Sequence, residues 1–271
     1  MKTSRSAGSV LAAILLGFLV ITALTPFVLM LITALQDTTT LSWRIDTSAI
    51  GLKNFVTIFT TYGFGRAVVN STVIVILACV LNMVVCSLAA YAFAKKPFPG
   101  SKALFWVYLA TMMMPGQITL IPLFLIMRDL NLLNTYISLA LPIVNAFGVF
   151  LIYQFMLGIP DDLIEAARID GARDLRIFVS IVLPLIRPVL IALTVFTFLS
   201  VWNDFLWPLV SISNDQMQTV TLAVANLQGN FVTRYGLVMA GATVAFAVPL
   251  LVYVVLQRSF VEGVASVGIK G

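Results

Sequence analysis

The 271-residue sequence contains no histidine and only two cysteines. Without histidine the chain lacks the commonest general base, and histidine-containing catalytic triads and metal motifs are excluded. Cys79 and Cys86 lie seven residues apart in one apolar run. On a helix they share a face at a separation of about 10 Å, which is too far for a disulfide. The cysteines therefore carry no information about the redox compartment.

Charge is also scarce. The chain is 61% hydrophobic and 10% charged, with a net charge of +5. A soluble domain of this length could not cover so much apolar surface, so we predict an all-α polytopic membrane protein in the lipid bilayer, folded as one unit. Basic residues at the membrane edges explain the net charge without nucleic acid. The nucleotide-binding pattern G-x-x-x-x-G-K-[ST] is absent, so ATP is not expected to bind this chain.

Six apolar stretches predict transmembrane helices. The first follows Lys2 and Arg5 and is longer than the core of about 7–15 residues that a cleavable signal peptide has, so it is expected to stay uncleaved. The third is interrupted by Met114-Pro115-Gly116-Gln117. The predicted spans are residues 10–35, 68–94, 103–127, 136–157, 189–210 and 237–256.

The distribution of basic residues predicts the orientation. With six spans and both termini in the cytosol, the inner segments hold eleven of the 16 lysines and arginines and the outer segments hold five. Because basic residues are enriched in cytoplasmic segments, this is the favoured topology.

Residues 158–188 form a loop that is too charged to cross a bilayer. Within it, Pro160 is suited to open a short helix, and the following aspartates suit the positive end of its dipole. Gly171 allows the left-handed turn that ends a helix. We therefore expect a cytosolic helix of about ten residues, or about 15 Å. Nine charged residues fall in the loop: Asp161, Asp162, Glu165, Arg168, Asp170, Arg173, Asp174, Arg176 and Arg187.

The spaced residues of this loop resemble the signature loop of permease subunits in binding-protein-dependent ATP-binding-cassette (ABC) importers. The match consists of Glu165, Ala166, Ala167, Asp170, Gly171, Ala172, Phe178, Ile181, Leu183, Pro184 and Pro188. The resemblance implies that Glu165, Ala166, Ala167, Asp170 and Gly171 couple this chain to an ATPase. Leu183, Pro184 and Pro188 would set the angle at which the loop re-enters the membrane.

Flanking motifs resemble the carbohydrate-uptake branch, and most closely the shorter permease of the maltose-type systems. They are Pro122-Leu123-Phe124, Leu133-Asn134-Thr135, Leu141-Pro142, Trp202-Asn203 and the tail residues Gln257, Arg258, Phe260, Gly263, Gly268, Lys270 and Gly271. The likeness covers nearly the whole chain.

What the resemblance implies is a sugar permease in a bacterial or archaeal plasma membrane. Its expected partners are a second permease subunit, two ATP-binding subunits that hold ATP and magnesium, and an extracytoplasmic substrate-binding protein. This chain would catalyse no bond-making step. Sugar-like solutes such as polyols and glycerophosphate remain alternative substrates.

Polar residues in or beside the spans are candidates for the substrate path, because burying them is costly unless they are paired or wet. Asp204 could bind hydroxyls or mark the membrane interface. Asn82 and Asn145 could touch substrate, although hydrogen bonds between helices are favoured. Trp202 could stack on a sugar ring or belong to an aromatic belt. Asn203, the next residue, is a further polar candidate for the substrate path.

Two other classes of protein fit less well. An ion-coupled secondary transporter would need carboxylates inside its spans, and Asp204 is the only near candidate. A membrane-embedded enzyme fits worse, since the chain lacks histidine and any pair of membrane-embedded carboxylates.

Overall fold

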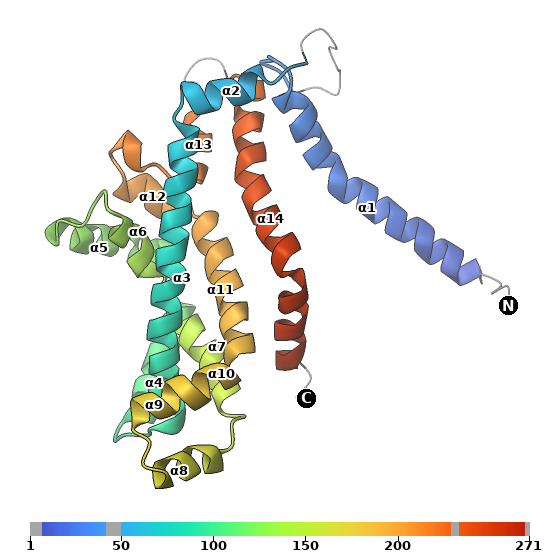
Figure 1. Ribbon diagram of the computed structural model, residues 1–271. Helices are drawn as coiled ribbons and strands as arrows, with labels where there is room; N and C mark the ends of the chain where they lie inside the picture. Colours follow the sequence, from blue (N-terminus) through green and yellow to red (C-terminus); the bar gives the residue numbers. More distant parts are fainter. Residues whose placement is uncertain (1–6, 42–49, 229–232, 269–271) are drawn as a thin grey trace. The chain divides into compact units, whose positions relative to one another are not determined.

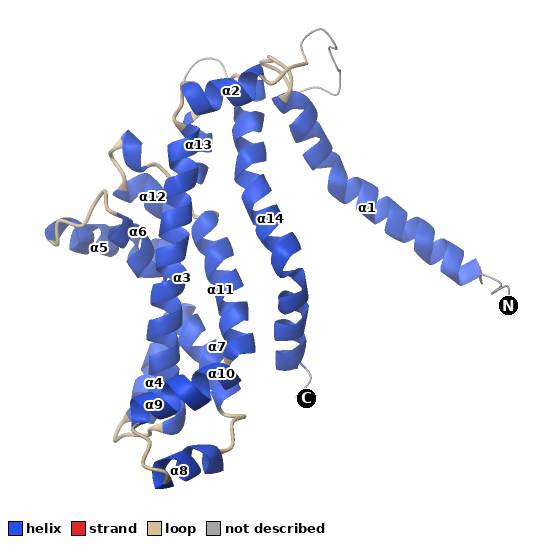
Figure 2. Ribbon diagram, viewed as in Figure 1, coloured by secondary structure: helices blue, strands red, loops and turns tan. Residues whose placement is uncertain are grey.

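The computed structural model describes residues 7–41, 50–228 and 233–268. Over these residues the ordered elements are helices and one isolated antiparallel bridge between Gln36 and Ile50, so the predicted all-α class is confirmed (Figure 2). The chain divides into two compact units, each described by itself below. Unit 1 comprises Met1–Gly65 with Ala223–Ala247, and unit 2 comprises Arg66–Leu222 with Val248–Gly271.

Unit 1 joins three helices through a tightly packed junction. These are α1 (Ala7–Ala34), α2 (Lys53–Thr60) and the first part of α14 (Tyr235–Gly268). The side-chain amide of Asn54 donates to the carbonyls of Ala34 at 2.9 Å and Gln36 at 2.8 Å. A Cβ atom on Gly236 would lie 2.1 Å from that Gln36 carbonyl, so only glycine fits there.

An acidic residue after α1 ties the same junction together outside the membrane. Asp37 accepts hydrogen bonds from Arg234 and Lys53, each at 2.9 Å. The bond from Arg234, and then the bond from Lys53, lowers the pKa of the Asp37 carboxyl. A lowered pKa means that this contribution to stability is present above the carboxyl's ordinary pKa and is lost as the pH falls through the lowered value.

Unit 2 is built around one long helix, α3 (Phe64–Lys95), which runs beside α11 (Figure 1). The remaining α-helices that lie in it wholly or in part are α4 (Ser101–Ala110), α5 (Gly116–Asp129), α6 (Tyr136–Ala140), α7 (Ala146–Met156), α8 (Asp161–Ile169), α9 (Asp174–Ile177), α10 (Leu183–Leu185), α11 (Arg187–Trp202), α12 (Leu206–Ser211), α13 (Val220–Asn226) and the second part of α14. Between them lie three short 3₁₀-helices, η1 (Thr111–Met113), η2 (Leu141–Ile143) and η4 (Asp215–Met217), and a π-helix, η3 (Phe178–Val182).

Within the part of the chain that the structure describes, three helices are long and apolar enough to cross a membrane, and up to six crossings result if each bent pair counts as one. The straight ones are Leu11–Ala34, Phe64–Lys95 and Tyr235–Val255. The third predicted span is broken at Met114–Pro115, as its sequence indicated, with a bend of 105°. The fourth and fifth expected spans, residues 136–157 and 189–210, differ from the structure. The fourth bends by 46° before Ala146, and α11 ends at Trp202.

The predicted loop of residues 158–188 also differs from the structure in its second half. Asp174–Leu185 is helical and returns into the core, where Ile177, Phe178 and Val182 are buried against α3 and α7. Four of the five residues from Phe178 to Val182 are apolar, and α3 and α7 supply the surface that buries them. Only the first half of the loop therefore projects from unit 2.

Candidate functional site

Helix α8 is framed by the start and stop signals found in the sequence. Pro160 precedes it, and Asp161 and Asp162 occupy its first turn. Gly171 has φ +79°, which confirms the predicted left-handed turn. The Ala172 N–H bonds the Ala167 carbonyl at 2.9 Å and the Gly171 N–H bonds the Arg168 carbonyl at 3.0 Å. This pair of bonds is a Schellman motif, so the helix has a defined end.

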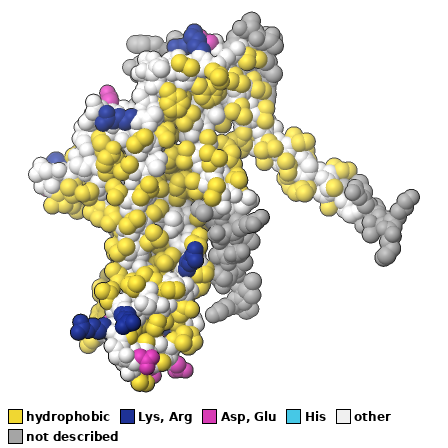
Figure 3. All heavy atoms as spheres, viewed as in Figure 1, with side chains coloured by type: hydrophobic (Ala, Val, Ile, Leu, Met, Phe, Trp, Pro, Cys, Tyr) yellow, Lys and Arg dark blue, Asp and Glu magenta, His cyan; other side chains and the backbone are white. Residues whose placement is uncertain are grey.

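One face of α8 is anchored and the other is free. Ile164 and Ala167 are buried in the core of unit 2, whereas Ile169 is 87% exposed and Leu163 is 46% exposed. Glu165, Ala166, Asp170 and Gly171 are exposed as well. Charged side chains gather around this end of unit 2 (Figure 3). Of the two alanines in the signature, Ala167 therefore packs the helix against the core and Ala166 lies on its exposed face.

The chain leaves this region through a sharp bend. The segment Asp174–Leu185 meets α11 at 77°, and the break falls at Ile186, between Pro184 and Pro188. Leu183 packs against the core and Pro184 is exposed. Pro184 and Pro188 therefore flank the bend between Asp174–Leu185 and α11. That these residues set the angle of re-entry into the membrane stays a prediction.

Two of the predicted substrate-path residues lie where three helices pack together. The Asn82 amide on α3 donates to Thr197 Oγ1 on α11 at 2.8 Å and accepts from the Cys86 thiol at 2.9 Å. Asn145 begins α7 and accepts from the Gly148 N–H at 3.2 Å. A Cβ atom on Gly148 would lie 2.7 Å from Cys86 Sγ, so α7 and α3 touch closely here. Both asparagines thus make contacts within this packing.

Trp202 and Asn203 lie at the end of α11. Trp202 is 2% exposed and stacks on Phe198 with ring centroids 5.8 Å apart. The exposed Asn203 side chain donates to the Leu199 carbonyl at 2.8 Å. Neither residue lines the cavity to which their neighbours Ser200, Val201 and Asp204 contribute. Their assignment to the substrate path stays a prediction.

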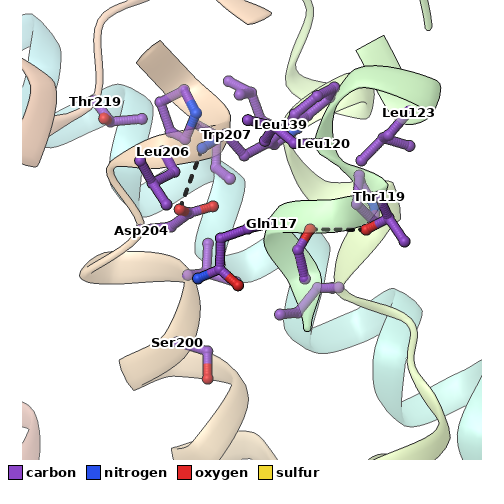
Figure 4. Close-up of a pocket in the computed structure, with 16 residues that line it drawn as sticks. Gln117, Thr119, Leu120, Leu123, Leu139, Ser200, Asp204, Leu206, Trp207 and Thr219 are labelled. Carbon is purple, nitrogen blue, oxygen red and sulfur yellow. Dashed lines mark hydrogen bonds between the residues drawn. The ribbon is translucent and has the colours of Figure 1, made fainter. Parts of the chain in front are cut away.

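Asp204 lines a cavity of about 310 Å³ in unit 2. It follows α11, and its carboxylate accepts from the Trp207 N–H at 3.4 Å. In Figure 4 the side chain of Gln117, from the first turn of α5, extends toward Asp204. The other polar residues of the lining are Thr119, Ser200 and Thr219, and leucines with Trp207 supply apolar walls.

The sequence did not single out the role of Gln117. It follows the Pro115-Gly116 break directly, and the 105° bend brings the start of α5 to the cavity. The sequence signal that could have identified Gln117 is a polar side chain directly after a break in an apolar span. Carboxylate, amide and hydroxyl groups on an otherwise apolar wall suit a ligand with both hydroxyl groups and apolar faces.

A family model described as "Binding-protein-dependent transport system inner membrane component" matches residues 83–266. The arabinooligosaccharides transport system permease protein AraQ of Halalkalibacterium halodurans is 37% identical over 232 residues, covering 83% of this chain and 82% of that protein. The sn-glycerol-3-phosphate transport system permease protein UgpE of Pectobacterium atrosepticum is 36% identical over 209 residues, covering 76% and 74%.

Two solved structures share the fold. One is the crystal structure of a bacterial ABC transporter involved in the import of the acidic polysaccharide alginate, with a TM-score of 0.83 and 22% identity over 96% of this chain and 99% of that one. The other is the alginate transporter in complex with an alginate pentasaccharide-bound periplasmic protein, with a TM-score of 0.66 and 18% identity over 93% and 95%. At these identities the likeness concerns the fold.

Proposed function

Because the chain belongs to the family of binding-protein-dependent transport system inner membrane components, we propose that it is one of two permease subunits in an importer for a sugar or oligosaccharide. ATP and magnesium bind a separate pair of ATPase subunits, and an extracytoplasmic binding protein delivers the substrate. The permease itself moves the substrate by alternating access and makes no bond.

The observation that carries this proposal is the geometry of α8. A nine-residue helix fixed by Ile164 and Ala167, with Ile169 87% exposed, presents apolar surface beside charged groups. An exposed apolar patch rimmed by polar residues is typical of a protein–protein contact. A separate ATPase that grips this face transmits its closure to the core beneath it.

The cavity at Asp204 supports a hydroxyl-rich substrate. A carboxylate accepts hydrogen bonds from hydroxyl groups, Gln117 both donates and accepts, and the apolar walls suit the faces of a sugar ring. Glycerophosphate, the solute in the name of UgpE, is the second candidate. Its phosphate would lie near a like charge at Asp204, so the cavity favours an uncharged sugar.

Asp204→Asn tests the substrate path. The amide can still accept from Trp207, so assembly and basal ATP hydrolysis should be unchanged, whereas uptake should fall about tenfold, equivalent to roughly 1.4 kcal/mol. Uptake and hydrolysis are measured on the reconstituted complex with its binding protein. Asp215→Asn, outside the cavity lining, is the matched control. Loss of the subunit from the membrane would instead make Asp204 structural, and normal uptake would remove it from the path.

Labelling tests the proposed orientation, with both termini and α8 in the cytosol. Single cysteines replace the exposed residues Arg173 and Thr61 in a background lacking Cys79 and Cys86. In right-side-out vesicles an impermeant maleimide should modify the Thr61→Cys protein at once and the Arg173→Cys protein only after permeabilisation. Modification of both from outside would rule out the six-span topology.

A further inference from the structure

Two adjacent lysines in and after the last turn of α3 hold both ends of the segment that contains α8. The side chain of Lys95 is 4% exposed, and its ammonium donates to the Ile159 carbonyl at 2.7 Å and to Asp161 at 2.6 Å. These partners precede and begin α8. A buried ammonium is expensive unless it is paired, so this contact is strongly specified.

The second lysine holds the other side of α8. Lys96 forms an ion pair with Asp174, the first residue of α9. One turn earlier on α3, Tyr91 packs against Phe178 with ring centroids 5.3 Å apart. Two ion pairs, both formed by lysines at the same end of α3, therefore hold the start of α8 and the residue that begins α9.

The opposite end of α3 is fixed to the chain beside the cavity. Asn70 donates to the Gln216 and Gln218 carbonyls at 2.9 and 3.0 Å, and Ser71 Oγ accepts from the Val220 N–H at 2.9 Å. This segment continues into Thr221, whose hydroxyl donates to the backbone carbonyl of Asp204 at 2.8 Å. The rise of an α-helix places Asn70 and Lys95 about 37 Å apart.

We propose that α3 is the strut that joins the ATPase contact to the cavity, and that Lys95 and Lys96 are positioning residues that make α8 move together with it. The proposal rests on the function assigned above. Both lysines act through α8, since neither lines the cavity at Asp204. The ion pairs stay closed through the transport cycle, so that displacement of α8 becomes displacement of α3.

Charge reversal tests the more exposed pair, which carries no second hydrogen bond to the backbone among the contacts described for it. In the reconstituted complex, Lys96→Glu or Asp174→Lys alone should lower sugar imported per ATP hydrolysed at least fivefold. The double variant, which restores the pair in reverse, should return the ratio to within twofold of the parent. A merely structural role would lower the amount of complex without changing this ratio. Lys102→Glu, from the same basic turn, is the control.

A cross-link gives a second measurement that does not depend on the single variants. Cysteines at positions 96 and 174, in the background lacking Cys79 and Cys86, are joined by a bifunctional thiol reagent long enough to replace the Lys96 side chain together with its ion pair. Joining them should raise import per ATP toward the parent value. An unchanged or lower ratio, or failure of the charge swap to restore it, would overturn the strut. A charge reversal on α8 itself, Glu165→Lys, tests the proposed function separately. If that variant changed neither the ATPase retained on purification nor the uptake, the proposed function would be overturned.

Discussion

Gly171→Val is expected to lower substrate uptake at least tenfold while the permease remains in the membrane. No atom lies within 4 Å of a Cβ added at this glycine, so the substitution causes no clash. Its effect is conformational. Valine in the left-handed region at φ +79° costs on the order of 1–2 kcal/mol, which opens the turn and releases the hydrogen bonds that end α8. The helix then tilts away from its partner.

Three quantities measured together decide this prediction: ATPase retained on purification, hydrolysis stimulated by the loaded binding protein, and uptake. Gly171→Asn is the matched control, because asparagine adopts the left-handed conformation more readily than valine. It should keep most of the uptake. Normal stimulation and uptake in the valine protein would mean that the end of α8 is not part of the transmission.

Glu165→Lys should have an effect at least as large, through a different cause. The Glu165 side chain is exposed, so its replacement disturbs no packing inside this chain. A lysine in the first turn of a helix costs only about 0.3–1 kcal/mol, and Glu165 lies in the second turn of α8, so the effect of the dipole is too small to unfold a membrane subunit. Loss of uptake with release of the ATPase would therefore report on the contact with the partner.

The control for this charge reversal is Asp162→Lys. Asp162 is exposed in the first turn of the same helix, where the helix dipole acts more strongly than at Glu165 in the second turn. If the two variants behave alike, the dipole accounts for the effect and Glu165 has no special place in the contact. If only Glu165→Lys releases the ATPase, the contact is centred on that side chain.

Helix α8 was predictable because its signals are local. Pro160, the aspartates after it and Gly171 act within one or two turns, and the structure places each where its conformational preference indicated. The six-span interpretation rests likewise on runs of apolar residues that can be counted along the chain.

The cavity and the lysine contacts were not predictable in this way. Gln117 and Asp204 meet only because α5 turns by 105° at its start, and nothing in the sequence gives the size of that turn. The carboxylate that Lys95 contacts lies 66 residues further along the chain. The burial of Phe178 also depends on α3 being present to cover it.

The close packing at Gly148 determines how α3 can move. A Cβ atom on Gly148 would lie 2.7 Å from Cys86 Sγ, so α3 and α7 are in close contact at this point, and we expect α3 to tilt about it. Asn82 marks this pivot, about 18 Å from Asn70 and about 20 Å from Lys95 by helical rise. A strut pivoted near its middle is a lever with nearly equal arms. If α3 tilts about this point, we expect a displacement at the Lys95 end to reach the Asn70 end with similar amplitude and opposite direction.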